Sequence, residues 1–194
     1  MKKLAITFLT ILFCLTSSIA WSETLSPTDL VKRNGIHYKM FTNVPFTGSV
    51  KGKDKDGYFE KGTYKDGKKN NVFETYYENG QLESKGTFKD GKFDGVYEYY
   101  HENGQLCSKG TYKNSKEEGL WVFYHDNGEL WYKGTYKNGK EEGLWEEYYD
   151  NGRLDRKGTY KDGKLNGISE HYYKNGKINN NYHGTYKNDV KTSD

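Results

Sequence analysis

Cysteine is nearly absent from this chain. Two cysteines occur in 194 residues, and Cys14 lies in a segment that we expect to be removed from the mature protein. Cys107 would then be the only remaining thiol, so an intrachain disulfide is excluded even though the chain is expected to enter an oxidising compartment. Packing and strand pairing must therefore stabilise the fold.

The sequence also lacks an excess of charge of one sign. Its formal net charge is +3, and removal of residues 1–22, which contain Lys2, Lys3 and no acidic residue, lowers it to about +1. Nucleic-acid-binding proteins usually carry a basic patch or stripe, which a nearly neutral and mixed surface does not provide. We therefore expect no nucleic-acid partner.

Aliphatic residues are scarce, whereas aromatic residues are frequent. Hydrophobic residues make up 33% of the chain and aromatic residues alone 16%, so ring faces must supply most of the buried surface. Disordered chains contain few aromatic residues. We expect a folded chain with a thin core.

Residues 1–22 have the order of a secretory signal peptide. Lys2 and Lys3 precede an apolar run over residues 4–15, and small residues follow around Ala20 and Ser22. An uncleaved membrane anchor is the alternative, but the run is short for a span of about 20 residues. The sequence thus predicts export to the periplasm, the cell surface or the medium.

A repeat occupies most of the remaining chain. The step Gly-Thr-aromatic begins at Gly62 and recurs at intervals of 24, 24, 24, 24 and 26 residues. Such self-similarity is typical of repeat architectures. We expect about five 24-residue copies and a partial copy over residues 61–189. Residues 23–60 should form a hairpin and a degenerate capping half-repeat, and residues 190–194 a polar tail.

Two turn signals divide each copy into two strands. An Asp-Gly step such as Asp66-Gly67 follows the Gly-Thr-aromatic step, and an Asn-Gly step such as Asn79-Gly80 lies half a copy later. Both dipeptides favour type I′ hairpin turns. The fold class is therefore all-β: an elongated, mostly single-layer antiparallel β-meander of repeated hairpins. Asn114-Ser115 replaces one Asp-Gly step, which should weaken that turn and preserve the topology. Whether the ribbon is flat or curls into a trough is left open.

The spacing also predicts which side chains share a face. A two-residue loop at Asn79-Gly80 would place Tyr77 opposite Leu82 and Phe73 opposite Gly86, where a ring can cover bare backbone. On the other face, Glu74 and Lys85 would form a cross-strand pair. We select the aromatic columns as candidate partner-binding residues; the alternative is that the rings only cover the sheet. These candidates are Phe73, Tyr97, Trp121, Trp145, Tyr77, Tyr149, Tyr100, Tyr124 and Tyr148.

The sequence offers little for catalysis or metal binding. His101 and His125 share a column, but columns two strands apart are separated by about 10 Å, too far for one zinc ion. Asp54 and Asp56 lack the further ligands of a calcium loop. Nucleophile and phosphate-binding motifs are absent, and the carboxylates recur in every copy. We expect no enzyme, no catalytic residues, no metal and no cofactor.

Two segments resemble a known family. They are KGTYKNGKEEGLWEEYYDNGRL at residues 133–154 and LVKRNGIHYKMFTNVPFTG at residues 30–48. They are similar to bacterial MORN-variant repeat proteins of the YwqK-type antitoxin family, and this resemblance implies a protein that binds and restrains a partner toxin. We expect a protein partner. A cell-surface or envelope module that binds glycans or lipid headgroups is the alternative, and a purely structural role comes third.

Overall fold

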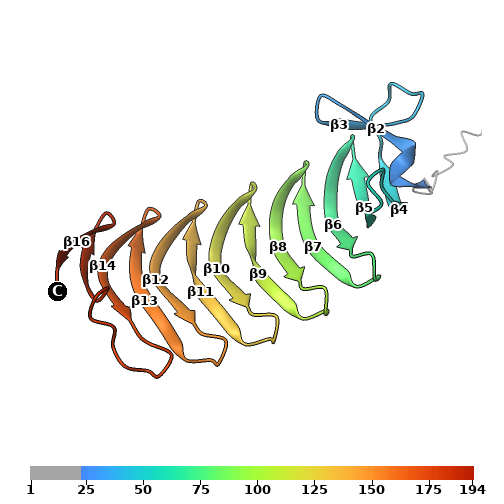
Figure 1. The fold of residues 1–194 in the computed structure, drawn as a ribbon. Helices are drawn as coiled ribbons and strands as arrows, with labels where there is room; N and C mark the ends of the chain where they lie inside the picture. Colours follow the sequence, from blue (N-terminus) through green and yellow to red (C-terminus); the bar gives the residue numbers. More distant parts are fainter. Residues whose placement is uncertain (1–22) are drawn as a thin grey trace, which may run out of the picture.

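The computed structural model describes residues 23–194, so the expected signal peptide lies outside the described residues. The chain forms one long sheet of 14 strands and a separate two-stranded hairpin (Figure 1). The strands of the long sheet, in spatial order, are β1 (Thr24–Leu25), β4 (Gly48–Lys53), β5 (Phe59–Lys65), β6 (Lys68–Tyr76), β7 (Leu82–Lys89), β8 (Lys92–Tyr100), β9 (Leu106–Lys113), β10 (Lys116–Tyr124), β11 (Leu130–Lys137), β12 (Lys140–Tyr148), β13 (Leu154–Lys161), β14 (Lys164–His171), β15 (Gly184–Lys187) and β16 (Val190–Ser193).

The predicted meander of repeated hairpins is confirmed. From β4 to β16 each strand pairs antiparallel with the next in sequence, and only β1 joins the sheet in parallel, beside β4. Sequential antiparallel pairing needs only short turns, which the sequence supplies twice in each copy. Within residues 23–194, no helix has the length and apolar character needed to span a membrane.

The turns at the Asp-Gly steps have the predicted conformation. Asp66 and Gly67 both have positive φ, at 49° and 74°, as a type I′ turn requires. Asn114 and Ser115 adopt the same conformation at 51° and 62°. The Ser115 hydroxyl accepts the Phe93 N–H at 3.1 Å. The altered turn therefore keeps its topology.

The loops at the Asn-Gly steps differ from the prediction. Only the glycine has positive φ, for example 84° at Gly80, and two bonds close a wider loop: Tyr77 N–H to Gln81 O and Gly80 N–H to Tyr77 O, both 2.9 Å. The Asn79 side chain accepts the Gln81 N–H at 2.9 Å, which favours this loop over a two-residue turn. The register shifts by one residue, so Tyr76 and not Tyr77 lies opposite Leu82. The predicted pairing of Tyr77 with Leu82 is wrong.

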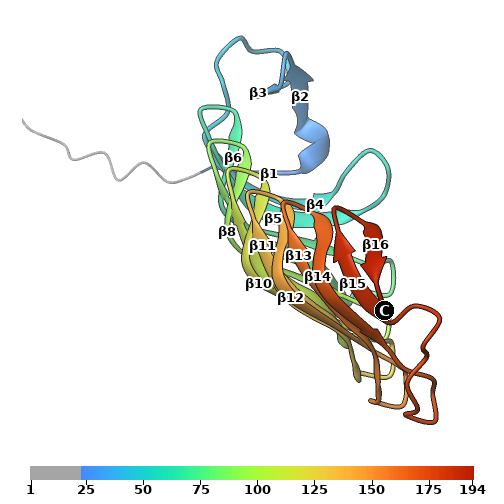
Figure 2. The same cartoon turned by 90° about the vertical axis from the view of Figure 1, so that its left-hand side faces the viewer.

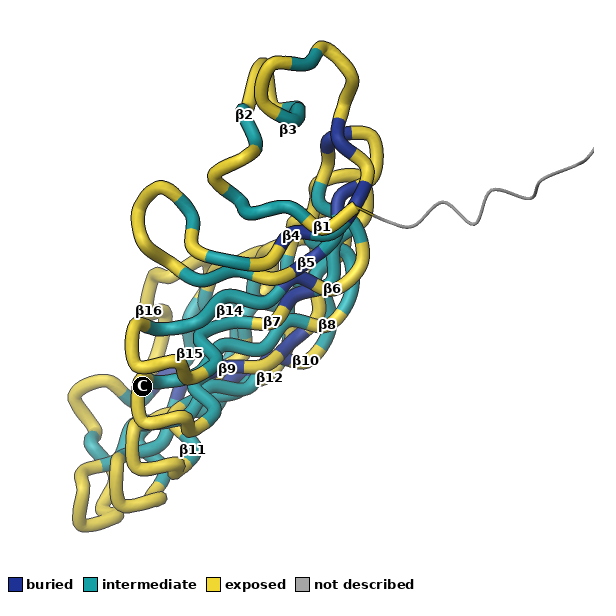
Figure 3. Tube along the Cα trace, turned by 90° about the vertical axis from the view of Figure 1, so that its right-hand side faces the viewer, coloured by how far each residue is buried: buried dark blue, intermediate teal, exposed yellow. Residues whose placement is uncertain are grey.

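The sheet curls into a trough. Hairpins closed by Asp-Gly turns lose their regular register at the Gly-Thr step, as between Gly86 and Phe88, and Gly95 on the facing strand has a φ of 132°. Irregularities of this kind bend a strand. Figures 1 and 2 show the hairpins as a row of arcs, and in Figure 3 the buried positions form a band along the middle of the strands.

The N-terminal segment packs against one end of the array. Strands β2 (Leu30–Arg33) and β3 (Ile36–Lys39) form the separate hairpin, which follows a 3₁₀ turn (Pro27–Asp29). His37 N–H donates to Gly67 O at 2.8 Å, and Gly67 N–H donates to Phe46 O at 2.7 Å. The hairpin thus contacts the β5–β6 turn. Phe46, Val50, Tyr64 and Phe73 form a buried cluster at this end.

The last residues are not a tail. Strand β16 occupies Val190–Ser193 and pairs with β15 through a turn at Asn188 and Asp189, whose φ values are 51° and 69°. The expectation of a polar tail over residues 190–194 is wrong for this strand. The turn lacks the glycine that marks most of the others, and an edge strand can be held by main-chain hydrogen bonds without apolar side chains.

Candidate functional site: the aromatic trough

One continuous file of aromatic rings runs inside the trough. Successive ring centroids lie 4.1 to 6.5 Å apart, and most pairs meet edge to face. This range matches the favoured geometry of aromatic pairs. The ring file consists of Tyr64, Phe73, Phe88, Phe93, Tyr97, Tyr112, Trp121, Tyr136, Trp145 and Tyr160.

Rings of the file cover glycines. A Cβ atom at Gly110 would lie 2.1 Å from Trp121, and one at Gly134 would lie 2.0 Å from Trp145. Trp121 is paired with Gly134, as Phe73 is with Gly86, but its ring lies over Gly110 of the other neighbouring strand. The register break between Glu118 and Val122 explains this difference, because it leaves Trp121 outside the ladder on the Gly110 side.

The central candidate residues are largely inaccessible. Phe73 and Trp121 are 3% exposed and Trp145 is 9% exposed, whereas Tyr97 is half-buried. A single sheet can bury rings to this extent because it wraps around them. Phe73, Trp121 and Trp145 therefore form the floor of the trough, and a partner would contact the residues above them.

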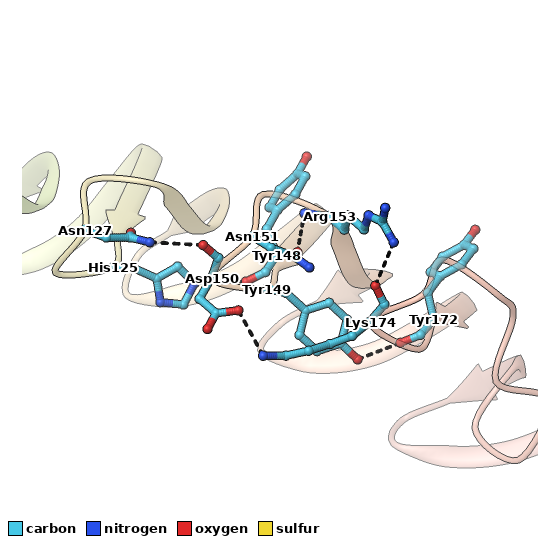
Figure 4. A network of polar contacts seen from close by, with 9 residues as sticks. All are labelled: His125, Asn127, Tyr148, Tyr149, Asp150, Asn151, Arg153, Tyr172 and Lys174. Carbon is cyan, nitrogen blue, oxygen red and sulfur yellow. Dashed lines mark hydrogen bonds and ion pairs between the residues drawn. The ribbon is translucent and has the colours of Figure 1, made fainter.

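Tyr77 and Tyr149 link neighbouring repeats. The Tyr77 hydroxyl donates to Tyr100 O at 2.5 Å, and the Tyr149 hydroxyl donates to Tyr172 O at 2.7 Å (Figure 4). His101 and His125 fill the same position in the two repeats between them, and each Nε2 lies 3.1 Å from the carbonyl of Tyr124 or Tyr148. A carbonyl only accepts, so these nitrogens carry the proton. This column holds the loops together.

The asparagines of the loops form a second link. Asn127 Oδ1 accepts the N–H of Glu129 at 2.9 Å within its own loop, and Asn127 Nδ2 donates to Asp150 O at 3.0 Å in the next (Figure 4). Asn79 and Asn103 repeat both bonds. In the following loop, Arg153 Nη1 donates to Lys174 O at 3.1 Å instead. Both links fix the spacing of the repeats.

Tyr100, Tyr124 and Tyr148 lie on the convex face beside a ladder of ion pairs. The Tyr100 hydroxyl donates to Glu98 at 3.1 Å, and Lys109 lies 2.9 Å from the same carboxylate. The Lys109 hydrogen bond, together with that of Tyr100, lowers the pKa of Glu98 despite its partial desolvation. In the repeat that contains Tyr124, Val122 occupies the position of the glutamate, so the ladder of ion pairs is interrupted there. Where carboxylate and lysine recur together, they act as structural cross-strand pairs.

The convex face also exposes an aliphatic row. Each repeat contributes one residue, and in the sheet each lies opposite a threonine of the following strand. The row consists of Val72, Val96, Leu120, Leu144 and Ile168. It provides exposed positions on the side away from the trough.

Two adjoining hollows line the trough above the ring file. One, of about 350 Å³, lies over β8–β11 and has Tyr99, Phe123 and Glu117 in its walls. The other, of about 320 Å³, lies over β11–β14. Tyr132 and Tyr136 line both, so the hollows are neighbours along the trough, and we call the two together the trough path.

The phenols of this path stay neutral at physiological pH. Burial raises the pKa of Tyr112 and Tyr132, and it raises that of Tyr136 to about 12. Their hydroxyls can thus donate or accept hydrogen bonds. Phe123 and Tyr132 stack with centroids 4.0 Å apart, which fixes part of the wall. The path combines flat apolar surface with fixed polar groups.

Sequence reasoning missed the walls of the trough. Tyr99 and Phe123 each lie two residues after a selected aromatic residue, and Tyr132 lies opposite Phe123. A flat ribbon gives them no common cavity. Ser169 was also missed, although the column Phe73, Tyr97, Trp121, Trp145 becomes serine there. Within residues 23–194, no group of three or more His, Cys, Asp or Glu side chains is arranged to hold a metal.

Comparison with known proteins places the chain in a family. A search of curated protein sequences finds no match. A solved structure described as "Crystal Structure of TarM" aligns at 8% identity with a TM-score of 0.30, over 48% of this chain and 20% of that chain. The family model described as "MORN repeat variant" matches residues 69–90, 93–114, 117–138, 141–162 and 165–188. These matches cover more than half of the sequence, and the chain belongs to the MORN repeat variant family.

Proposed function

We propose that this protein is a non-catalytic binding module that holds an extended polypeptide in its aromatic trough. The observation that carries the proposal is the pair of neighbouring hollows along the trough, which share Tyr132 and Tyr136 as lining residues. Tyrosine and tryptophan are enriched at the centres of protein interfaces because they bury a large area and retain a polar group. Repeat arrays commonly use extended concave surfaces for binding.

The rigidity of the trough favours binding. Side chains such as Tyr149 and Asn127 tie each loop to the next, and Phe123 stacks on Tyr132 in the wall. A partner would therefore meet walls that are already ordered. Less conformational entropy is lost when one side of an interface is preorganised.

The charges of the convex face favour a polypeptide partner over an anionic polymer or membrane on that side. Glutamates and lysines alternate as pairs on the convex face, for example Glu146 with Lys133 and Glu170 with Lys157, so no uncompensated basic stripe arises there. The resemblance to YwqK-type antitoxins supports a polypeptide, and the expected signal peptide would place the encounter outside the cytoplasm. The repeated, ion-paired carboxylates support a non-catalytic role.

Binding should be tested with a matched pair of variants in β10. Phe123→Lys places a charge in the trough wall, whereas Val122→Lys places the same charge on the convex face of the same strand. A polypeptide captured by the mature protein would be identified, purified and titrated against both variants. We expect Phe123→Lys to weaken binding at least tenfold and Val122→Lys to leave it unchanged. Tyr99→Lys serves as a second trough variant if the first is unstable.

Two outcomes would contradict the proposal. Loss of binding in Val122→Lys alone would move the contact to the convex face. Retention of the purified protein on polysaccharide or lipid vesicles, with no polypeptide bound at micromolar concentration, would favour the glycan or headgroup function.

A further inference from the structure

The aromatic column is interrupted in the fifth repeat. Phe73, Tyr97, Trp121 and Trp145 occupy one position in four successive repeats, and Ser169 occupies it in the next. Ser169 lies between Gly158 and Gly184, as each ring lies between two glycines, and it is paired with both. The ring file ends at Tyr160, one strand before Ser169.

A hollow adjoins the position of the missing ring. The hollow of about 320 Å³ lies at this point, and Trp145, Tyr160, Leu165 and Ser169 are among its lining residues. A Cβ on Gly158 would meet a methyl of Leu165 at 2.7 Å, and the Ser169 hydroxyl and the edge of the Tyr160 ring at 3.6 Å. The equivalent glycines Gly110 and Gly134 have an indole at 2.0 to 2.1 Å.

The space has a polar side and a charged rim. Ser169 is 2% exposed, and its hydroxyl lies 3.2 Å from His171 Nε2. At the rim, Arg156 Nε donates to Glu147 at 2.5 Å, and both side chains line the hollow. The hollow thus combines aromatic walls with polar groups that could fix the orientation of a bound side chain or ligand.

We propose that this hollow, the Ser169 pocket, receives an aromatic side chain of the polypeptide partner. The array itself indicates the occupant, because the same position holds an aromatic ring in the four preceding repeats. A ring from the partner would extend the ring file and meet the edge of Trp145, while Arg156 and Glu147 would face the partner's main chain. This inference rests on the proposed function and names the anchor that the trough uses.

The pocket can be tested by filling it from within. Ser169→Tyr supplies the ring that the array uses beside an apolar neighbour, since Tyr97 contacts Phe93 at the position equivalent to Leu165. Ile168→Tyr is the matched control, because Ile168 is the adjacent residue, is 60% exposed and lies on the convex face. We expect Ser169→Tyr to fold with an unchanged or higher Tm. A marked fall in Tm, repeated in Ser169→Phe, would show that the space does not accept a ring.

Binding is measured first with a small probe. N-acetyl-tyrosinamide added to the isotope-labelled protein should shift the amide NMR signals of Gly158, Ser169 and His171, and N-acetyl-leucinamide should shift them much less. The shifts should vanish in Ser169→Tyr and persist in Ile168→Tyr. Equal shifts with both probes, or no shifts in the wild-type protein, would contradict the pocket proposal. This comparison of the two probes uses the wild-type protein alone, so it does not depend on the folding of a variant.

Measurements with the polypeptide partner distinguish a failure of the pocket proposal from a failure of the proposed function. We expect Ser169→Tyr to lower the affinity for the identified polypeptide at least tenfold. Ile168→Tyr should leave this affinity unchanged. Equal binding by the wild-type protein and Ser169→Tyr would overturn the pocket and leave the trough function standing. Probe binding without any polypeptide partner would overturn the proposed function, and with it the partner named for the pocket.

Discussion

Asn127 and Asp150 lie in successive loops, and the Asn127 side-chain amide donates to the Asp150 main-chain carbonyl at 3.0 Å. Asn151, one repeat later, makes only the bond within its own loop, to the Arg153 N–H at 3.1 Å. A comparison of Asn127 with Asn151 therefore distinguishes the contribution of the bond between repeats from that of the bond within the loop.

We expect Asn127→Ala to lower the free energy of unfolding by about 1–2 kcal/mol and Asn151→Ala by about half as much, since a hydrogen bond contributes roughly 0.5–1.5 kcal/mol. Denaturant titration of both variants measures the difference. Equal losses would mean that the bond to Asp150 contributes nothing.

The glycines beneath the rings should differ in their tolerance of alanine. Gly134→Ala places a methyl group 2.0 Å from the Trp145 indole, which is held on several sides. We expect a loss of about 1–3 kcal/mol from overpacking. Gly158→Ala is the control, because it meets only a movable Leu165 methyl below 3 Å, and it should cost much less. Thermal unfolding of both variants tests this, and similar Tm values would contradict it.

Ser115 allows the cost of its positive φ to be isolated. Ser115→Ala and Ser115→Gly both remove the hydroxyl that accepts the Phe93 N–H, but only alanine retains a Cβ at a φ of 62°. The left-handed conformation costs roughly 1–2 kcal/mol for a residue with a Cβ. Ser115→Gly should therefore be more stable than Ser115→Ala by about 1 kcal/mol in denaturant titration. The reverse order would show that the turn changes conformation.

Acid should weaken the ladder on the convex face. The Lys109 hydrogen bond, assisted by Tyr100 and by the positive charge of Lys85, holds the pKa of Glu98 below its usual value of 4.5. The resulting stabilisation is complete above about pH 4.5 and is lost as the pH falls through the lowered pKa. The Tm of the wild-type protein should fall more steeply below pH 4.5 than that of Glu98→Gln. Glu78→Gln, in an exposed loop, should retain the wild-type slope.

Much of this fold can be read from spacing alone. The Asp-Gly steps, the pairing of Phe73 with Gly86 and the pairing of Glu74 with Lys85 follow from a 24-residue period and the alternation of side chains in a strand. The Asn-Gly loops do not, because the same dipeptide fits a two-residue turn and a wider loop. Bonds to the next repeat, such as that from Tyr77 to Tyr100, accompany the wider loop and are invisible to a local pattern.

The candidate site was harder to predict because it depends on curvature. Phe73, Trp121 and Trp145 were selected correctly as one column, but a flat ribbon would expose rings that the trough buries. The glycine that recurs on the facing strands, as at Gly95 and Gly167, is the sequence signal for the bend. Side chains such as Phe123 and Tyr132 become walls only after this bend is known.

The bonds from loop to loop recur in nearly the same form at each step, so adding a repeat creates no new kind of junction. Duplication of 24 codons would insert two strands and extend the trough by about 10 Å. Gain or loss of a repeat can therefore change the length of the trough while the residue types that line it stay the same. Evolution can adjust this protein by length, one unit at a time.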